Sequence, residues 1–294
     1  ELDYTKDFRG FETGTEDYIK TAYTVNNLGL TTKITYTDYT AGSATGAKKE
    51  EYTMSYDKRG YITSETAYTN YGTAKTVNKT YTYDNVGRLT KATVGDDEKT
   101  YTYDSVGNRL TMSDGTDTFK YGYNQFNQLM SVTKNDKEYT KYTYDDRGNQ
   151  LTEKQLYMTV DADKYYRETA YTYDLRNNMT KAEVTTPDYV NNQVTTSKVT
   201  QTNAYNASGQ RIQKVEGGET TNYYYMGSAL LFSSNANNWL LTENVLDPNG
   251  IIVASARFDD TNPAESKREG FYFYHYDLRG STTAIVGANG KLQK

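Results

Sequence analysis

One ten-residue pattern is repeated along most of this chain. Its clearest copy is segment 81–90, with the sequence Tyr-Thr-Tyr-Asp-Asn-Val-Gly-Arg-Leu-Thr. Tyr81 and Tyr83 are two residues apart, so in a β-strand both rings lie on one face. Asp84 suits the first position of a tight turn because its side chain accepts a backbone N–H two residues on, and Gly87 tolerates positive φ. The pattern therefore predicts a strand, a turn and the start of a return strand.

The copies follow one another at a regular interval. The residues that define the pattern most clearly are Tyr83, Asp84, Gly87, Tyr103, Asp104, Gly107, Tyr144, Asp145, Gly148, Tyr173, Asp174, Tyr276, Asp277 and Gly280. The tyrosine before the Asp or Asn falls at positions 56, 83, 103, 123, 144, 173 and 205. The base period is about 20 residues, and we attribute the longer intervals to insertions into one turn. Self-similarity at a fixed period indicates a repeat architecture.

The composition favours a folded, all-β chain. Aliphatic residues are few, but 32 tyrosines supply apolar surface, and the net charge is only −5. Tyrosine and threonine are typical of strands, and a tyrosine can bury its ring while its hydroxyl finds a partner. A 20-residue period less two turns of about four leaves two strands of about six residues. No segment of about 12 residues has helical periodicity.

Eight to ten such repeats predict about 16 to 20 antiparallel strands. Open sheets of more than about ten strands curl or close. Strand twist would coil a long meander into a spiralling strip whose turns stack on one another, which also protects the strand edges. Such a strip would form a curved wall with an inside and an outside.

The pattern resembles the YD repeats of Rhs-type proteins, a group that includes wall-associated proteins, shell subunits of insecticidal toxin complexes and animal teneurins. The segment 274–284, Tyr-His-Tyr-Asp-Leu-Arg-Gly-Ser-Thr-Thr-Ala, is similar to the start of the Rhs-associated core region, with Arg279 where that pattern tends to have Leu. The resemblance covers roughly residues 50 to 294. It implies a hollow β-shell around a C-terminal polypeptide, often a toxin, in an exported bacterial protein that is secreted or associated with the cell surface.

Three segments of the chain differ in how regular their repeats are. Residues 1–50 are expected to be irregular N-terminal β-repeats, with 41–49 as a long hairpin loop. Residues 51–215 hold the clean repeats and are expected to form the YD-repeat strip. Residues 216–294 are divergent repeats that run into the start of the Rhs-associated core region. The partners that the resemblance implies are other segments of the same, longer polypeptide, including a C-terminal cargo.

Several classes of function lack support in the sequence. There is no cysteine, so disulfides and thiolate metal sites are excluded. No apolar run approaches the roughly 18 residues of a membrane-spanning helix, and no basic stripe indicates nucleic-acid binding. The first residues do not form a signal peptide, and we expect the chain to be an excised piece of something longer. We expect no cofactor.

Candidate catalytic residues have a simpler structural explanation. The sole histidine, His275, alternates with Tyr274 and Tyr276 in a predicted strand, which favours a structural role. The acidic pairs Asp96-Asp97, Asp145-Asp146 and Asp259-Asp260 resemble the carboxylates of glycosidases, but all three fall in predicted turns, where solvated acids are expected. Asp114 with Asp117, and Asp161 with Asp163, lack the loop pattern of a known calcium motif. We therefore expect no catalytic residue and no metal site.

Three functions remain open. The first is a non-catalytic structural module that encloses or displays another polypeptide. The second is a carbohydrate-binding module of the cell surface, because tyrosines on an exposed face can stack on sugars, although packing between neighbouring strands is the favoured role of these rings. The third and least favoured is an enzyme such as a glycosidase.

Overall fold

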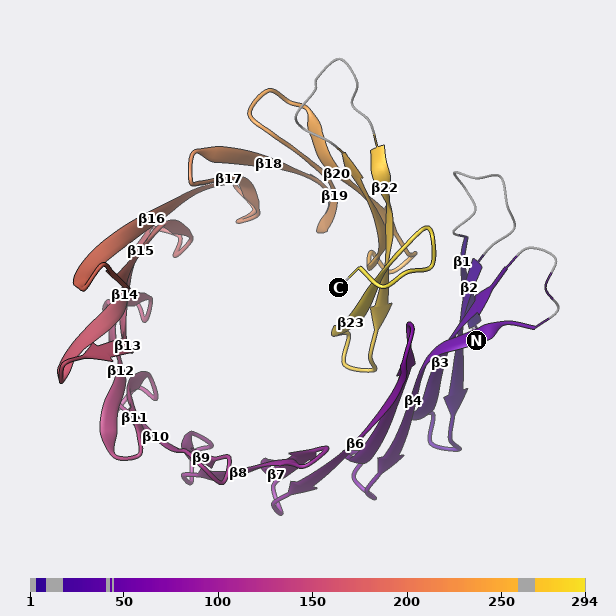
Figure 1. Ribbon diagram of the computed structural model, residues 1–294, viewed down its shortest axis with the longest axis horizontal. Helices are drawn as coiled ribbons and strands as arrows, with labels where there is room; N and C mark the ends of the chain where they lie inside the picture. Colours follow the sequence, from indigo (N-terminus) through magenta and orange to yellow (C-terminus); the bar gives the residue numbers. More distant parts are fainter. Residues whose placement is uncertain (1–3, 9–17, 41–42, 44, 259–267, 294) are drawn as a thin grey trace. The chain divides into compact units, whose positions relative to one another are not determined.

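A computed structural model describes residues 4–8, 18–40, 43, 45–258 and 268–293. These residues form 23 β-strands, and no helix occurs among them. The predicted all-β class is therefore confirmed, as is the antiparallel meander: strands that follow one another in sequence pair side by side (Figure 1). The described part of the chain accordingly offers no helix that is long and apolar enough to cross a membrane.

The chain divides into two compact units. Unit 1 combines Glu1–Glu98, Tyr225–Phe232 and Leu240–Lys294, and unit 2 combines Lys99–Tyr224 with Ser233–Trp239. The strands of unit 1 are β1 (Tyr4–Phe8), β2 (Tyr18–Val25), β3 (Thr31–Tyr39), β4 (Ala47–Tyr56), β5 (Ile62–Asn70), β6 (Ala74–Tyr83), β7 (Leu89–Val94), β20 (Leu240–Leu246), β21 (Ile252–Phe258), β22 (Arg268–Tyr276) and β23 (Thr282–Gly287).

Unit 2 holds the most regular repeats. Its strands are β8 (Asp97–Tyr103), β9 (Arg109–Ser113), β10 (Thr118–Tyr123), β11 (Leu129–Lys134), β12 (Lys137–Tyr144), β13 (Gln150–Val160), β14 (Asp163–Tyr173), β15 (Met179–Val190), β16 (Gln193–Tyr205), β17 (Arg211–Glu216) and β18 (Glu219–Met226). The ends of β8 and β18 extend into unit 1, and the residues of β19 (Ala229–Ser234) are divided between the units.

The main core lies in unit 1, where early and late strands of the sequence pack together. Its cluster of buried residues brings β2 to β5 against β23, through Ile19, Ile34, Tyr36, Tyr52, Met54, Ala67, Ala284 and Val286. These residues occupy alternate positions of their strands, as a half-buried sheet requires. The antiparallel series β1 to β7 and the series β20 to β23 are therefore joined by side-chain packing as well as by the chain.

Unit 2 is an antiparallel meander in which few side chains are fully buried, Val132 and Thr140 among them. Each pairing that ends in the repeat pattern has a register shift just before the tyrosine, as between Thr143 and Tyr144 and between Thr172 and Tyr173. A β-bulge of this kind adds one residue on one strand and increases the local twist. The repeats therefore place a bulge at the same point of successive hairpins.

The long intervals in the sequence have a different origin from the one predicted. The tyrosines at 173 and 205 are separated by β15 and β16, which have 12 and 13 residues and pair with each other from Lys181–Thr202 to Val190–Gln193. The turn between them is still only Asn191-Asn192, both with positive φ, as a type I′ hairpin turn requires. The inserted residues therefore lengthen the strands and not the turn, and Pro187, which falls in this long interval, lies inside β15 opposite Thr196.

A second correction concerns the expected loop at 41–49. Strand β4 begins at Ala47 and pairs with β3, so residues 47–49 belong to the sheet. Residues 41, 42 and 44 lie outside the described residues. The alternation Glu50, Tyr52, Met54 extends the buried face of β4 almost to its start.

Candidate functional site

The repeat turns are built around one carboxylate or amide side chain. In one of them, Asp84 donates its backbone N–H to the carbonyl of Arg88, and Gly87 donates its N–H to the carbonyl of Asp84. Asp84 Oδ1 accepts the backbone N–H groups of Val86 and Arg88 at 3.0 and 2.9 Å, and Oδ2 accepts Arg88 Nε at 2.7 Å. Donors in the turn itself thus use both oxygens of the carboxylate, and they lower the pKa of Asp84 below its usual range.

The same turn occurs wherever the pattern places it. The side-chain oxygen accepts the N–H groups two and four residues on, in turns that begin at Asn26, Asp57, Asp84, Asp104, Asn124, Asp145, Asp174, Asn206, Asn235, Asp247 and Asp277. The fourth position is a Gly or Asn with positive φ. At Gly87, where φ is +89°, a Cβ would also meet the hydroxyl of Tyr61, so a larger residue there would have to displace that side chain.

Where a tyrosine precedes the turn, its hydroxyl can tie the repeat to the preceding one. Tyr144 donates its hydroxyl to the carbonyl of Leu129 at 2.9 Å, and Leu129 is the sixth residue after Tyr123, the residue that precedes the previous turn. The same offset of six from the residue before the previous turn, which is Val25 for Thr31 and Leu246 for Ile252, recurs in the pairs Tyr56 to Thr31, Tyr83 to Ile62, Tyr123 to Arg109, Tyr173 to Gln150, Tyr205 to Met179 and Tyr276 to Ile252. We call this series the tyrosine ladder.

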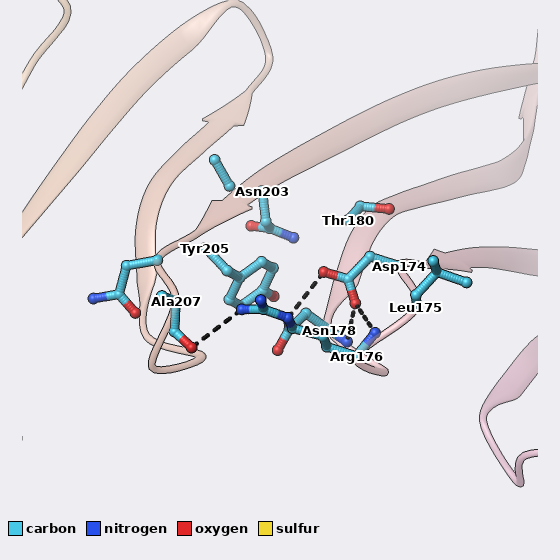
Figure 2. A pocket seen from close by; sticks show the side chains of 10 residues that line it. Asp174, Leu175, Arg176, Asn178, Thr180, Asn203, Tyr205 and Ala207 are labelled. Atoms are coloured by element: carbon cyan, nitrogen blue, oxygen red, sulfur yellow. Dashed lines mark hydrogen bonds between the residues drawn. The ribbon is translucent and has the colours of Figure 1, made fainter.

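Neighbouring turns of unit 2 are also joined directly. Arg176 donates from its guanidinium to the carbonyl of Ala207 at 3.1 Å (Figure 2). Arg147 makes the equivalent bond to the carbonyl of Asp174. A cavity of about 490 Å³ lies between the turns of Asp174 and Asn206, and a similar one of about 480 Å³ lies beside Arg147. Both cavities lie between two successive repeat turns, at equivalent positions of the repeat. They are therefore a recurring feature of the turn row and not a single specialised site.

Many tyrosine rings in the sheet are covered by a cation. Arg109 lies over the ring of Tyr121 at 4.3 Å, and Lys154 lies over the ring of Tyr166 at 4.7 Å. Similar pairs are Arg211 with Tyr223, Arg257 with Tyr272 and Lys48 with Tyr68. Cation–π contact occupies the ring face that a sugar would need. These rings therefore do not form an open stacking platform.

The candidate acidic sites do not assemble. Asp96 lies in a hairpin turn and Asp97 begins β8, both exposed, whereas Asp145 is the first residue of a repeat turn and Asp146 the exposed second. Asp114 receives the N–H groups of Thr116 and Asp117 in its own turn, and Asp161 and Asp163 are exposed at the β13–β14 hairpin. Asp259-Asp260 lies outside the described residues. Among those that are described, no group of three or more His, Cys, Asp or Glu side chains could hold a metal ion.

A buried polar cluster in unit 1 was not predicted. His275 and Glu50 are both fully buried, and His275 Nδ1 lies 2.5 Å from Glu50 Oε1. Tyr52 and Tyr71 each donate to Glu50 at 2.5 Å, Thr283 donates at 3.1 Å, and the ring of Tyr36 stacks on His275. We call these six residues the Glu50 cluster. Burial raises the pKa of Tyr36, Tyr52 and Tyr71 above the ordinary range for tyrosine.

A second buried carboxylate stands on the next strand. Glu65 on β5 is bound by Lys79 at 2.5 Å and by Arg279 at 2.8 Å, and only 4% of its side chain is exposed. Arg279 also pairs with Asp277 of its own turn at 3.3 Å. Arg279, which stands where the Rhs-associated pattern tends to have Leu, therefore supplies a positive charge to the buried carboxylate of Glu65 on β5.

Sequence reasoning placed His275 in a strand and missed Glu50, Glu65 and Tyr71. The alternation of Glu50 with Tyr52 and Met54, and of Glu65 with Ala67, was the available signal, because it puts an acid on an apolar face. The turns that begin at Asn235 and Asp247 were not recognised as copies of the pattern either, since Ser234 and Leu246 stand where the tyrosine would be.

Comparison with known proteins gives partial matches. No family model matches the chain. It is 27% identical over 192 residues to the tRNA3(Ser)-specific nuclease WapA of Bacillus spizizenii, a match that covers 57% of this chain and 8% of that protein. It is 26% identical over 194 residues to the tRNA nuclease WapA of Bacillus subtilis strain 168, with the same coverage. The chain thus spans less than a tenth of the length of these relatives.

Among solved structures, the Photorhabdus luminescens Tc holotoxin pore aligns with 94% of this chain and 17% of its own chain. The sequence identity is 14% and the TM-score is 0.41.

Proposed function

We propose that this chain is a non-catalytic structural module of YD repeats, part of a β-shell that encloses or displays a C-terminal polypeptide in an exported bacterial protein. The observation that carries the proposal is the tyrosine ladder with its constant offset of six residues. A catalytic site occurs once in a protein, whereas this contact is repeated hairpin after hairpin. Residues repeated in this way serve the wall itself.

The self-contained turns support the same proposal. The aspartates at Asp104, Asp145 and Asp174 bind donors of their own turns, so these carboxylates are engaged in holding the backbone. Similarity to WapA proteins, which are named as tRNA nucleases, favours a context in which a repeat region accompanies a toxic enzyme. In this proposal the nuclease or other activity resides in the cargo and not in the repeats.

Protease protection tests the proposal. A polypeptide that carries these repeats and a C-terminal cargo segment is expressed and treated with protease. Wild type should protect the C-terminal segment, and a variant with Tyr144→Phe, Tyr173→Phe and Tyr205→Phe should expose it, because three ladder bonds are lost. Tyr157→Phe, at a ring that is 54% exposed, is the matched control. Undiminished protection after deletion of residues 99–224 would contradict an enclosing role.

A carbohydrate-binding module of the cell surface is the alternative. The cations over Tyr121, Tyr166 and Tyr223 weigh against it, since they occupy ring faces on which sugars would stack. Calorimetric titration of the chain with wall polysaccharide separates the two proposals: binding that is lost on Tyr121→Ala and kept in the ladder variant would favour the carbohydrate module.

A further inference from the structure

One buried acid–base pair joins strands from the two ends of the sequence. Glu50 on β4 and His275 on β22 are 225 positions apart, and His275 is the chain's single histidine. We propose that this pair is an acid-sensitive clasp: it holds β22 and β23 against β3, β4 and β5 while Glu50 is ionised, and it releases them when Glu50 takes up a proton.

The hydrogen bonds of the cluster suit an ionised Glu50. Its carboxylate accepts the hydroxyl of Tyr71 at Oε1 and those of Tyr52 and Thr283 at Oε2, and His275 Nδ1 lies 2.5 Å from Oε1. An ionised carboxylate is an acceptor with about four lone-pair sites, so it can take the three hydroxyls and also the Nδ1–H group of His275 when that atom carries a proton. When Glu50 and His275 Nδ1 both carry protons, Glu50 presents an O–H group of its own to this ring of donors. At least one buried donor then loses its partner, which is costly away from water.

His275 has no other polar anchor of comparable quality. Its Nε2 atom is buried and has no hydrogen-bond partner among the described residues, so the polar contacts of the ring are at Nδ1, with Glu50 at 2.5 Å and Tyr71 at 3.1 Å. The ring is otherwise held by its stack on Tyr36, at 4.0 Å between ring centres. The attachment of β22 at this point therefore depends on the charge state of Glu50.

The groups around Glu50 come from every neighbouring strand. Tyr36 faces it from β3, Tyr52 from β4, Tyr71 from the loop after β5, and Thr283 from β23. The other nearby charges are matched to one another, because Lys79 and Arg279 bind Glu65. Within the described residues, His275 is thus the one basic group that bonds to Glu50.

The direction of the pH effect follows from Glu50. Burial by itself raises the pKa of this carboxyl, but the hydrogen bond and charge of His275, with the hydroxyls of Tyr52 and Tyr71, outweigh burial and lower the pKa below the ordinary glutamate value. A lowered pKa means that the clasp contributes its full stability above the unfolded-state value of about 4.3 and loses it as the pH falls below that value. Opening is therefore expected on acidification.

Release should be local to the seam between early and late strands. Within the Glu50 cluster, Tyr36 also ties β3 to β22 through its hydroxyl, which donates to the carbonyl of Tyr276 and accepts the N–H of Tyr276, each at 2.8 Å. Unit 2 contains no residue of the cluster. The clasp would thus loosen β22 and β23 while the repeats of unit 2 keep their hydrogen bonds.

Hydrogen exchange of the full 294-residue chain tests the clasp. Exchange of residues 271–286 is measured at about pH 7 and about pH 3, corrected for intrinsic chemistry, with residues 129–144 of unit 2 as the internal reference. Wild type should open at 271–286 about tenfold more at the lower pH relative to the reference. Glu50→Gln, which mimics the protonated acid, should be open already at the higher pH and show no further response.

Two control variants make the result decisive. Glu65→Gln removes the neighbouring buried carboxylate and should keep the acid response, as should Glu183→Gln, which removes an exposed carboxylate paired with Lys181 and Lys198. The proposal would be overturned if acidification lowered the exchange protection of residues 271–286 and of unit 2 to the same extent. It would also be overturned if Glu50→Gln kept the full response of residues 271–286 to acid. If Glu50→Gln does not fold, the wild-type titration still decides, because a step centred above about pH 5.5 would assign the proton to another group.

Discussion

The hydroxyl of Tyr173 donates a hydrogen bond to the backbone carbonyl of Gln150, 2.9 Å away and 23 positions earlier in the chain. Gln150 is the sixth residue after Tyr144, and Tyr144 makes the same bond to the repeat before it. Each tyrosine of the ladder thus acts twice, as the marker of its own turn and as the donor to the preceding hairpin. A side-chain contact of fixed offset therefore links each hairpin of the sheet to the preceding one at an equivalent point.

Tyr173→Phe removes one ladder bond and leaves the ring in place. We expect a loss of about 1 kcal/mol in the free energy of unfolding, because the carbonyl of Gln150 loses a half-buried partner. Urea denaturation followed by circular dichroism measures it, with Tyr157→Phe as the control at an exposed ring. Equal stability of the two variants would show that the ladder is incidental to the stability of the wall.

Asp145 holds its turn because one side-chain oxygen accepts two backbone N–H groups. We therefore expect the stability of the turn to depend more on the presence of this oxygen than on the negative charge. Asp145→Ala leaves the N–H groups of Arg147 and Asn149 without their acceptor, and we expect a lower melting temperature. Asp145→Asn keeps an oxygen there, as Asn124 and Asn206 do in their own turns, and should cost well under half as much. Thermal unfolding compares the two, with Asp146→Ala as the control at the adjacent exposed acid. A cost of Asp145→Asn equal to that of Asp145→Ala would point to charge instead.

Gly280 tests the backbone requirement of the fourth turn position. Its φ is +76°, and a Cβ there would meet no atom within 4 Å, so the cost of a side chain is conformational only. We expect Gly280→Ala to destabilise unit 1 by about 1 kcal/mol, and Gly280→Asn to be better tolerated, because Asn127 and Asn177 adopt φ of 60° and 64° at the equivalent position. Melting temperatures of the three proteins report the order, and a melting temperature of the Ala variant at or above that of the Asn variant would contradict it.

Arg279 should matter more than its partly exposed position suggests. Its guanidinium is one of two cations that bind the buried Glu65, and Arg279→Leu would leave that carboxylate to Lys79 alone. We expect a loss of about 1 to 3 kcal/mol, from a charge that stays buried with fewer partners. Arg147→Leu, at an exposed turn arginine, should cost less than 1 kcal/mol. Chemical denaturation measures both, and the reverse order would mean that Lys79 satisfies Glu65 unaided.

Local features of this protein were readable because each depends on residues close in sequence. The turn at Asp84 needs an oxygen, two N–H groups within four residues and a residue that accepts positive φ, and the sequence contains all of them. The same reasoning failed for the long intervals, because a strand can lengthen when its partner lengthens too, as β15 and β16 do. Pairing between two segments is not visible in either one alone.

The sequence by itself determined the all-β class, the antiparallel order of hairpins and the identity of the turns, since these follow from a two-residue side-chain alternation and from turn chemistry that acts over four residues. Only the tertiary structure decided that Glu50 meets His275, that Glu65 meets Arg279 and that the early strands of unit 1 pack against β22 and β23. Those contacts join residues more than 200 positions apart. Their energy comes from burial that exists only once both segments are in place, and no local pattern records it.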